Sequence, residues 1–171
     1  MKHQKLYHLV LAALFAALTY VATNIIHVPI PATDGYINLG DCVVLLGAFL
    51  LGPVYGAAAG GIGSALADIL SGYAVFAPGT FVIKALIAVI AALIMKALGS
   101  KTKAAPIVAS IAGEAWMLLG YFLYESIFLG YGLAAAGSIG GNAIQAVAGV
   151  ILAAALYAVL SKVPQIKKAA A

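Results

Sequence analysis

The stretch LGDCVVLLGAFLLGPVYGAAAGGIGSALADIL, residues 39–70, decides the fold class. Its charged residues are Asp41 and Asp68, close to its two ends, and Gly52-Pro53 interrupts the apolar run in the middle. A helix crosses the hydrocarbon core of a bilayer with about 20 apolar residues, and proline breaks such a helix. We therefore interpret 39–51 as a short membrane helix and 54–70 as a longer one, joined by a tight turn.

The rest of the chain repeats this apolar pattern. Of its 171 residues 65% are hydrophobic and 8% are charged, whereas a soluble domain has about 45–50% apolar and about 25% charged residues. This composition argues against a soluble globular enzyme and against a disordered chain. Further apolar runs cover 6–26, 81–98, 106–129 and 138–160. We predict one all-α domain, residues 1–171: an integral membrane bundle of six transmembrane helices in the cell membrane.

The distribution of lysine predicts the orientation of this bundle. All nine basic residues are Lys, and eight of them fall in three clusters, within 2–5, 96–103 and 162–168. In a six-span topology these clusters all lie on one side, which is cytoplasmic by the positive-inside rule. Both termini are then cytoplasmic. Clusters at the ends of apolar runs do not resemble a nucleic-acid groove, so we expect no nucleic-acid partner.

Polar groups inside the apolar runs gather near the predicted outer face. Because a charge in the bilayer interior is costly, each of these groups needs a partner or a function. Six such residues come from five helices and suggest a ligand pocket open to the exterior: Asp41, Asp68, Lys84, Glu125, Asn142 and Gln145. Structural roles compete with this hypothesis. Lys84 and Asp68 would then neutralise each other, and Asp41 would cap its helix.

The residue types suggest what such a pocket binds. A carboxylate accepts hydrogen bonds from an aminopyrimidine or pairs with a protonated ring nitrogen, amides match ring edges, and Trp116 or Tyr121 covers a ring face or simply packs. We predict ligand contacts from Glu125, Tyr121, Asn142, Gln145, Trp116, Asn38, Asp41 and Lys84. Glu114 lies deeper on the same face as Glu125. A lone cysteine, Cys42, excludes a Cys-based zinc site, and we predict neither a metal nor a cofactor.

Small residues recur every four positions on two helices. Gly52, Gly56, Gly60 and Ser64 follow one stripe, for which we expect packing inside the bundle. Two overlapping Ala-x-x-x-Ala pairs stand on the first helix, at Ala12, Ala13, Ala16 and Ala17. For these alanines we predict docking on a partner in the membrane.

Motifs of nucleotide binding and catalysis are missing from the sequence. It contains no P-loop, no metalloprotease H-E-x-x-H and no nucleophile-elbow G-x-S-x-G. We therefore predict no catalytic residue and no enzymatic activity. Six helices are also few for a transporter built of internal repeats.

Several motifs together resemble a known family. They are the alanines of the first helix, the run GYINLGD at 35–41, LGP at 51–53, and above all the stretch from Ala67-Asp68 through Gly72-Tyr73 and Pro78-Gly79-Thr80 to Ile83-Lys84. With the six-span layout, they resemble the substrate-binding S components of energy-coupling factor (ECF) transporters, of the riboflavin and hydroxymethylpyrimidine or pyridoxine types.

The resemblance implies a membrane subunit that captures a vitamin from outside. It would deliver the vitamin inward with a transmembrane coupling protein and two ATPase subunits, and the alanine face of the first helix would dock on the coupling protein. It also implies an architectural role for Asp68 and Lys84. The ring-binding residues favour hydroxymethylpyrimidine or a pyridoxine-like vitamin.

Three other functions compete with this interpretation. They are a standalone small-solute carrier or channel that works without ATPases, an intramembrane enzyme, and a purely structural membrane subunit. A small molecule that co-purifies with the chain would separate these hypotheses most directly.

Overall fold

A computed structural model describes residues 2–99, 102 and 104–163, with side chains from residue 4 onward. Nearly all of this chain is helical. The elements are α1 (Lys2–Ile25), β1 (Val28–Ile30), β2 (Gly35–Ile37), α2 (Gly40–Leu70), α3 (Ala77–Leu98), α4 (Ala105–Leu123), the π-helical turn η1 (Tyr124–Phe128), the 3₁₀ helix η2 (Gly132–Ser138) and α5 (Ile139–Leu160).

The number of membrane helices differs from the prediction. Within the described residues five helices, not six, are long and apolar enough to cross a bilayer. The difference lies in α2, where 39–51 and 54–70 were expected as separate spans. Its first arm, 40–51, would reach only roughly 18 Å at about 1.5 Å per residue, short of the roughly 30 Å hydrocarbon core.

The two arms of α2 fold back on each other at Gly52. Gly52 has φ 76° inside the helix, and Pro53 follows it. A Cβ atom added to Gly56 would lie 2.9 Å from the Cα of Ala48, and one added to Gly60 would lie 2.9 Å from a methyl group of Val44. Such backbone contact requires glycine, so the small-residue stripe packs inside the bundle, as predicted.

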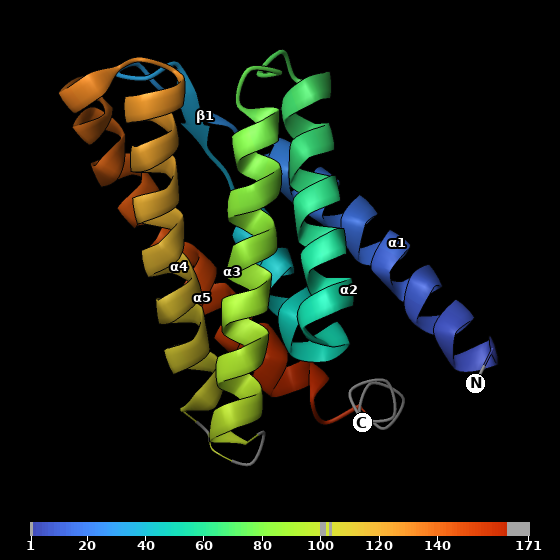
Figure 1. Cartoon of the computed structure of the whole chain (residues 1–171). Helices are drawn as coiled ribbons and strands as arrows, with labels where there is room; N and C mark the ends of the chain where they lie inside the picture. Colours follow the sequence, from blue (N-terminus) through green and yellow to red (C-terminus); the bar gives the residue numbers. More distant parts are fainter. Residues whose placement is uncertain (1, 100–101, 103, 164–171) are drawn as a thin grey trace.

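The helices stand side by side, and α1 leans away from the others toward its N-terminus (Figure 1). The start of α1 and the end of α5 lie at the same end of the bundle, opposite the β1–β2 hairpin (Figure 1). The main apolar core fills the space between α2, α3, α4 and α5, with Leu45, Ile87 and Met117 fully buried. The described part of α1 adds a second, smaller cluster around Ala12.

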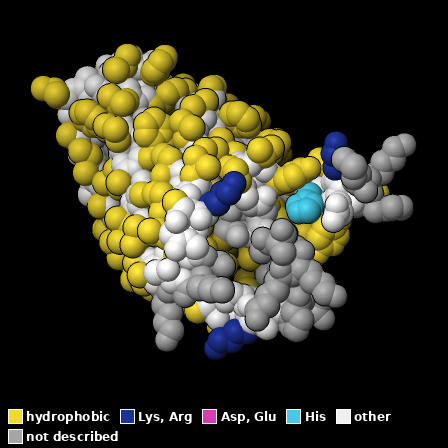
Figure 2. Space-filling model, turned by 60° about the horizontal axis from the view of Figure 1, so that its bottom comes forward, with side chains coloured by type: hydrophobic (Ala, Val, Ile, Leu, Met, Phe, Trp, Pro, Cys, Tyr) yellow, Lys and Arg dark blue, Asp and Glu magenta, His cyan; other side chains and the backbone are white. Residues whose placement is uncertain are grey.

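The surface is apolar and several charges are inside, the reverse of a soluble protein. Large hydrophobic side chains such as Leu9, Val54 and Ile151 are more than half exposed, whereas Lys84 and Asp41 are buried. Hydrophobic side chains cover much of the face that Figure 2 shows, and Lys and His side chains stand around the end that is lowest in Figure 1 and is turned forward here. This arrangement fits a lipid-facing exterior.

The lysine clusters are partly described by the structure. Lys5, Lys96 and Lys162 are exposed. The remaining lysines of the three clusters lie outside the residues whose side chains are described: Lys2, Lys101, Lys103, Lys167 and Lys168.

Residues 27–38, between the first two apolar runs of the sequence, contain a short hairpin. Val28 pairs with Ile37 and Ile30 with Gly35 in antiparallel register. Asp34, at φ 54°, allows the turn between the strands. Because the hairpin supplies residues to the cavity beneath it, its position decides the geometry of the candidate site.

Candidate functional site

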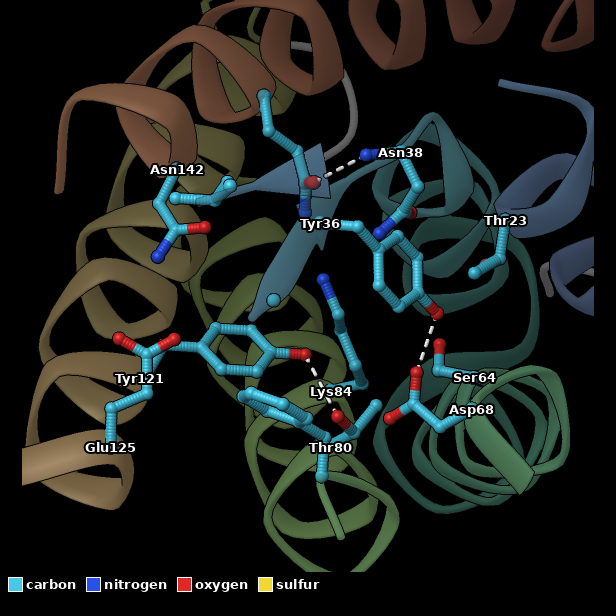
Figure 3. A pocket seen from close by; sticks show the side chains of 14 residues that line it. Thr23, Tyr36, Asn38, Ser64, Asp68, Thr80, Lys84, Tyr121, Glu125 and Asn142 are labelled. Atoms are coloured by element: carbon cyan, nitrogen blue, oxygen red, sulfur yellow. Dashed lines mark hydrogen bonds between the residues drawn. The ribbon is translucent and has the colours of Figure 1, made fainter. Parts of the chain in front are cut away.

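One cavity lies between the hairpin and the helices. About 430 Å³ of space free of protein atoms lies there, a volume that includes open solvent at the mouth of the cavity. Its walls come from every helix of the bundle and from the hairpin (Figure 3). The lining residues are Thr23, Ile30, Gly35, Tyr36, Asn38, Ser64, Asp68, Phe76, Thr80, Lys84, Tyr121, Glu125, Asn142 and Gln145.

A buried ion pair forms the floor of this pocket. Lys84 of α3 donates to Asp41 of α2 in a salt bridge, and both side chains are almost fully buried. Gln145 of α5 donates to the other oxygen of Asp41 at 2.6 Å, and its own oxygen accepts from the backbone N–H of Asn38 at 2.7 Å. This network joins three helices and the end of the hairpin.

The predicted pairing of Lys84 with Asp68 is therefore wrong. After β2 the chain enters the bundle, so α2 begins in its interior. Asp41 accordingly lies beside Gly149, in the middle of α5: a Cβ added to Gly149 would be 3.3 Å from that of Asp41. The prediction had placed Asp41 at the outer face, as a cap of its helix. In the structure the amide oxygen of Asn38 accepts from the backbone N–H of Gly40 at the start of α2, at 2.8 Å, and Asp41 is the partner of Lys84.

Asp68 instead binds the hairpin. One carboxylate oxygen accepts from the hydroxyl of Tyr36 at 2.5 Å. The Tyr36 ring stacks on His27, with ring centroids 3.6 Å apart, and Tyr73 packs beside both. Burial, reinforced by the charge of Asp68, raises the pKa of Tyr36 far above its usual range. Burial also lowers the pKa of His27, while the charge of Asp68 raises it to a lesser extent.

Glu125 joins the hairpin to the end of the bundle. It belongs to η1, where the helix widens to a π-turn, a feature frequent at functional sites. Its two carboxylate oxygens accept from the hydroxyls of Ser138, at 2.5 Å, and Thr33, at 3.4 Å. The Asn142 amide donates to Ser138 at 3.5 Å, so a polar chain runs from the hairpin turn to α5.

Tyr121 forms the side of the pocket nearest α3. Its hydroxyl lies 3.1 Å from that of Thr80, and the ammonium group of Lys84 lies 5.3 Å from the centre of its ring. A ring in this position offers a face to a flat ligand.

The structure brings together most of the residues predicted to contact a ligand. Asn38, Lys84, Tyr121, Glu125, Asn142 and Gln145 line the pocket. Asp41 supports it as the partner of Lys84. Trp116 does not line it: its ring packs against the main core, and its indole N–H is buried without a partner in the described chain. Trp116 and Tyr121 both lie on α4, but the rotation of this helix about its axis points Trp116 away from the pocket.

Several lining residues were not among the predicted contacts. Thr23 and Ser64 are small hydroxyl residues whose importance no local motif indicates. Tyr36 belongs to β2 of the hairpin, and Phe76 directly precedes α3. A stronger weight on polar residues in apolar helices would have identified Thr23 and Ser64.

Glu114 lies below the pocket and is buried. Neither of its carboxylate oxygens has a hydrogen-bond partner within the described chain. One of them occupies the space left by Gly149, where an added Cβ would approach it to 2.8 Å. The missing side chain of Gly149 thus makes room for the carboxyl group of Glu114.

The alanines of α1 divide into two pairs. Ala12 is buried in the small cluster with α2, and Ala16 packs against the same cluster. Ala13 and Ala17 are exposed. Two of the four alanines predicted to dock on a partner therefore pack within the chain, and the other two are exposed.

The pocket has more negative than positive groups. Lys84 is paired with Asp41, whereas Asp68 and Glu125 are held by hydroxyl groups, with no cation within salt-bridge distance among the described side chains. The described residues contain no cluster of three His, Cys, Asp or Glu that could hold a metal ion. The site is suited to binding a small molecule that donates hydrogen bonds.

Comparisons with known proteins agree with this geometry. The family model described as ECF-type riboflavin transporter, S component, matches residues 3–162. A Pyrococcus woesei protein described as "uncharacterized protein in gap 3'region" is 38% identical over 142 residues, which are 83% of this chain and 93% of the relative.

A solved structure shares the fold. It is described as "Structure and mechanism of the S component of a bacterial ECF transporter" and aligns with a TM-score of 0.74 at 23% identity, covering 92% of this chain and 97% of that one.

Proposed function

The chain belongs to the family of ECF-type riboflavin transporter S components, and from this premise we propose that its pocket captures a small heteroaromatic vitamin or vitamin precursor. The chain is a membrane-embedded, multi-pass protein and the substrate-binding subunit of an ECF importer. The substrate, the partners, the orientation and the count of six helical segments are proposals, and each has its own support.

The observation that carries the substrate proposal is a pair of carboxylates without a cation. Asp68 and Glu125 line the pocket and accept hydrogen bonds only from hydroxyl groups. In a site of low dielectric constant such groups favour a ligand with N–H donors or a protonated ring nitrogen, and they disfavour an anion. Hydroxymethylpyrimidine and pyridoxine-like vitamins have this chemistry.

Riboflavin is the second candidate, and the family description supports it. Its ring system is also flat and carries a ring N–H donor. It is larger than a single pyrimidine or pyridine ring, so it would need more room between the hairpin and the helices. Direct binding measurements with all three compounds separate these candidates.

For the orientation we propose six helical segments, with the two arms of α2 counted separately, and both termini in the cytoplasm. The fold-back at Gly52 supports the count, because the two arms run in opposite directions. The lysine clusters support the orientation by the positive-inside rule. The pocket, at the hairpin end of the bundle, would then open to the exterior.

For the partners we propose a transmembrane coupling protein and two ATPase subunits. The exposed alanines of α1, Ala13 and Ala17, would allow a helix of the coupling protein to approach closely. Uptake into vesicles that contain only this chain would instead support the alternative, a standalone carrier or channel.

The experiment starts from the chain purified gently from its membranes. Native mass spectrometry identifies any co-purified small molecule, and titration of the ligand-free protein gives affinities for hydroxymethylpyrimidine, pyridoxine and riboflavin. Glu125→Gln and Asn142→Ala are expected to weaken binding of the true ligand by about tenfold or more, since each removes a polar partner.

Trp116→Phe is the matched control for these variants. Trp116 lies on α4, which leads into the η1 turn with Glu125, but it does not line the pocket, so its substitution should leave the affinity unchanged. Unchanged affinity in both Glu125→Gln and Asn142→Ala would refute the proposed site.

A further inference from the structure

The pocket has a second polar wall, opposite Tyr121, Glu125 and Asn142. We propose that this wall is a subsite for a hydroxyl-bearing side arm of the ligand. It consists of Thr23 on α1 with Ser64 and Asp68 on α2. This inference rests on the proposed function, because it assumes that the pocket holds a ligand whose ring lies toward Glu125 and Asn142.

Three buried polar atoms of this wall have no partner. The hydroxyl oxygens of Thr23 and Ser64 and one carboxylate oxygen of Asp68, Oδ2, make no hydrogen bond in the described chain. The three residues are only 1–2% exposed, and all of them line the pocket. Buried polar atoms are nearly always hydrogen-bonded, so three together on one cavity wall indicate a missing partner.

The positions of these residues make a continuous surface. Ser64 and Asp68 are four residues apart on α2 and therefore share a helix face. Thr23 reaches the same wall from α1. Figure 3 shows the three side chains along one side of the pocket, with Tyr121, Glu125 and Asn142 on the other side. The width of the pocket thus separates two sets of polar groups.

The chemistry of the wall specifies the arm. Oδ2 of Asp68 can only accept when ionised, so it requires a donor. The hydroxyls of Thr23 and Ser64 both donate and accept. A ligand hydroxyl satisfies all three atoms, because it donates one hydrogen bond and accepts others. A carboxylate or phosphate arm would bring a second negative charge beside Asp68 and is disfavoured.

Packing alone does not explain the arrangement. Other hydroxyls near the pocket have partners: Thr80 is bonded to Tyr121, and Ser138 to Glu125. The chain could have used Val or Ala at positions 23 and 64 without losing any hydrogen bond in the ligand-free state.

The test compares ligands with and without the arm. The probes are three pairs: hydroxymethylpyrimidine and its methyl analogue, pyridoxine and its deoxy analogue, and riboflavin and lumichrome, which lacks the sugar-alcohol chain. The pair whose hydroxylated member binds the wild-type chain best is then titrated against Thr23→Val and Ser64→Ala.

Each variant is expected to weaken the hydroxylated member by about three- to tenfold and to leave the analogue unchanged, as for the loss of one hydrogen bond. Ser110→Ala is the matched control. Ser110 is also buried on a helix without a partner in the described chain, but it does not line the pocket. Its substitution should affect neither ligand.

Thermal melting of the ligand-free variants separates binding from folding. Thr23→Val and Ser64→Ala are expected to melt no lower than the wild type, because no bond is lost. A large drop in melting temperature would assign these hydroxyls to structure and overturn the proposal.

The remaining outcomes are distinct. If the wild type binds a ring compound and its analogue equally well, or if the variants weaken both equally, the subsite is wrong and the proposed function stands. If none of the ring compounds binds, the proposed function and the subsite fall together.

Discussion

Lys84 illustrates how a single residue is tolerated in the interior of this bundle. It is 1% exposed and donates to Asp41, which is completely buried and also accepts from Gln145. A buried ion pair gives little net stability, but removing one partner leaves an uncompensated charge. The resemblance assigned Lys84 an architectural role, and its contacts agree with that role, although its partner is Asp41 and not Asp68.

A prediction at this scale concerns the charge balance. Lys84→Met should lower the free energy of unfolding by about 3–5 kcal/mol, because it leaves the Asp41 carboxylate buried without a cation. The double variant Asp41→Asn with Lys84→Met should recover most of the loss, since no charge remains. Denaturation of the purified chain in detergent measures both.

Lys96→Met provides the comparison, as Lys96 lies on the same helix but is exposed. It should change stability little. A double variant that is no more stable than Lys84→Met would contradict the pairing.

At the scale of elements, α2 is the piece on which the site depends. Its first arm begins inside the bundle at Gly40 and places Asp41 under the pocket, and its second arm carries Ser64 and Asp68 along the wall. The arms can lie this close only because Gly56 and Gly60 carry no side chain against Ala48 and Val44. The glycine stripe therefore fixes the distance between the floor and the wall of the pocket.

Substitution of Gly56 tests this role. Gly56→Ala should destabilise the chain by about 1–3 kcal/mol, because its Cβ would lie 2.9 Å from the backbone of Ala48, which cannot move aside. It should also weaken ligand binding by shifting Asp41. The melting temperature and the binding titration report the two effects.

Gly47→Ala is the matched glycine substitution in the first arm. The added Cβ would lie 3.4 Å from the ring edge of Phe15 and 4.0 Å from the Cα of Gly56, which are ordinary contacts. This variant should keep its stability, because alanine also has a higher helix propensity than glycine. An equal loss in both variants would show that the close approach of Gly56 to Ala48 is not the cause.

At the scale of the whole molecule, the arrangement of apolar and charged surfaces governs the orientation. The flanks are apolar, and the described lysines outside the core, Lys5, Lys96 and Lys162, are exposed. Figure 1 places the start of α1 and the end of α5 at one end of the bundle and the hairpin at the other, and hairpin residues line the pocket. Capture from outside therefore requires the hairpin end to face the exterior.

Labelling of intact cells tests this orientation. In a Cys42→Ala background, Ala74→Cys near the hairpin end should react with a membrane-impermeant maleimide added from outside, because Ala74 is exposed in the loop between α2 and α3. Thr102→Cys, between α3 and α4, should react only after the membrane is permeabilised. The reverse pattern would invert the proposed topology.

The sequence alone determined the membrane class, the approximate helix limits, the glycine packing and six of the fourteen residues that line the pocket. These follow from local quantities: the length of an apolar run, the position of Gly52-Pro53, and the spacing of polar residues along one helix. Together with the motifs between Ala67 and Lys84, they were also sufficient to indicate the family.

Only the tertiary structure decided which side chains meet. The positions of Asp41 and Asp68 along the sequence allowed either residue to pair with Lys84. In the same way, the positions of Trp116 and Tyr121 allowed either of them to cover a ligand ring. The depth at which α2 starts, and the rotation of each helix about its axis, settle such choices. These quantities arise from packing between helices distant in sequence, and no local pattern in the chain encodes them.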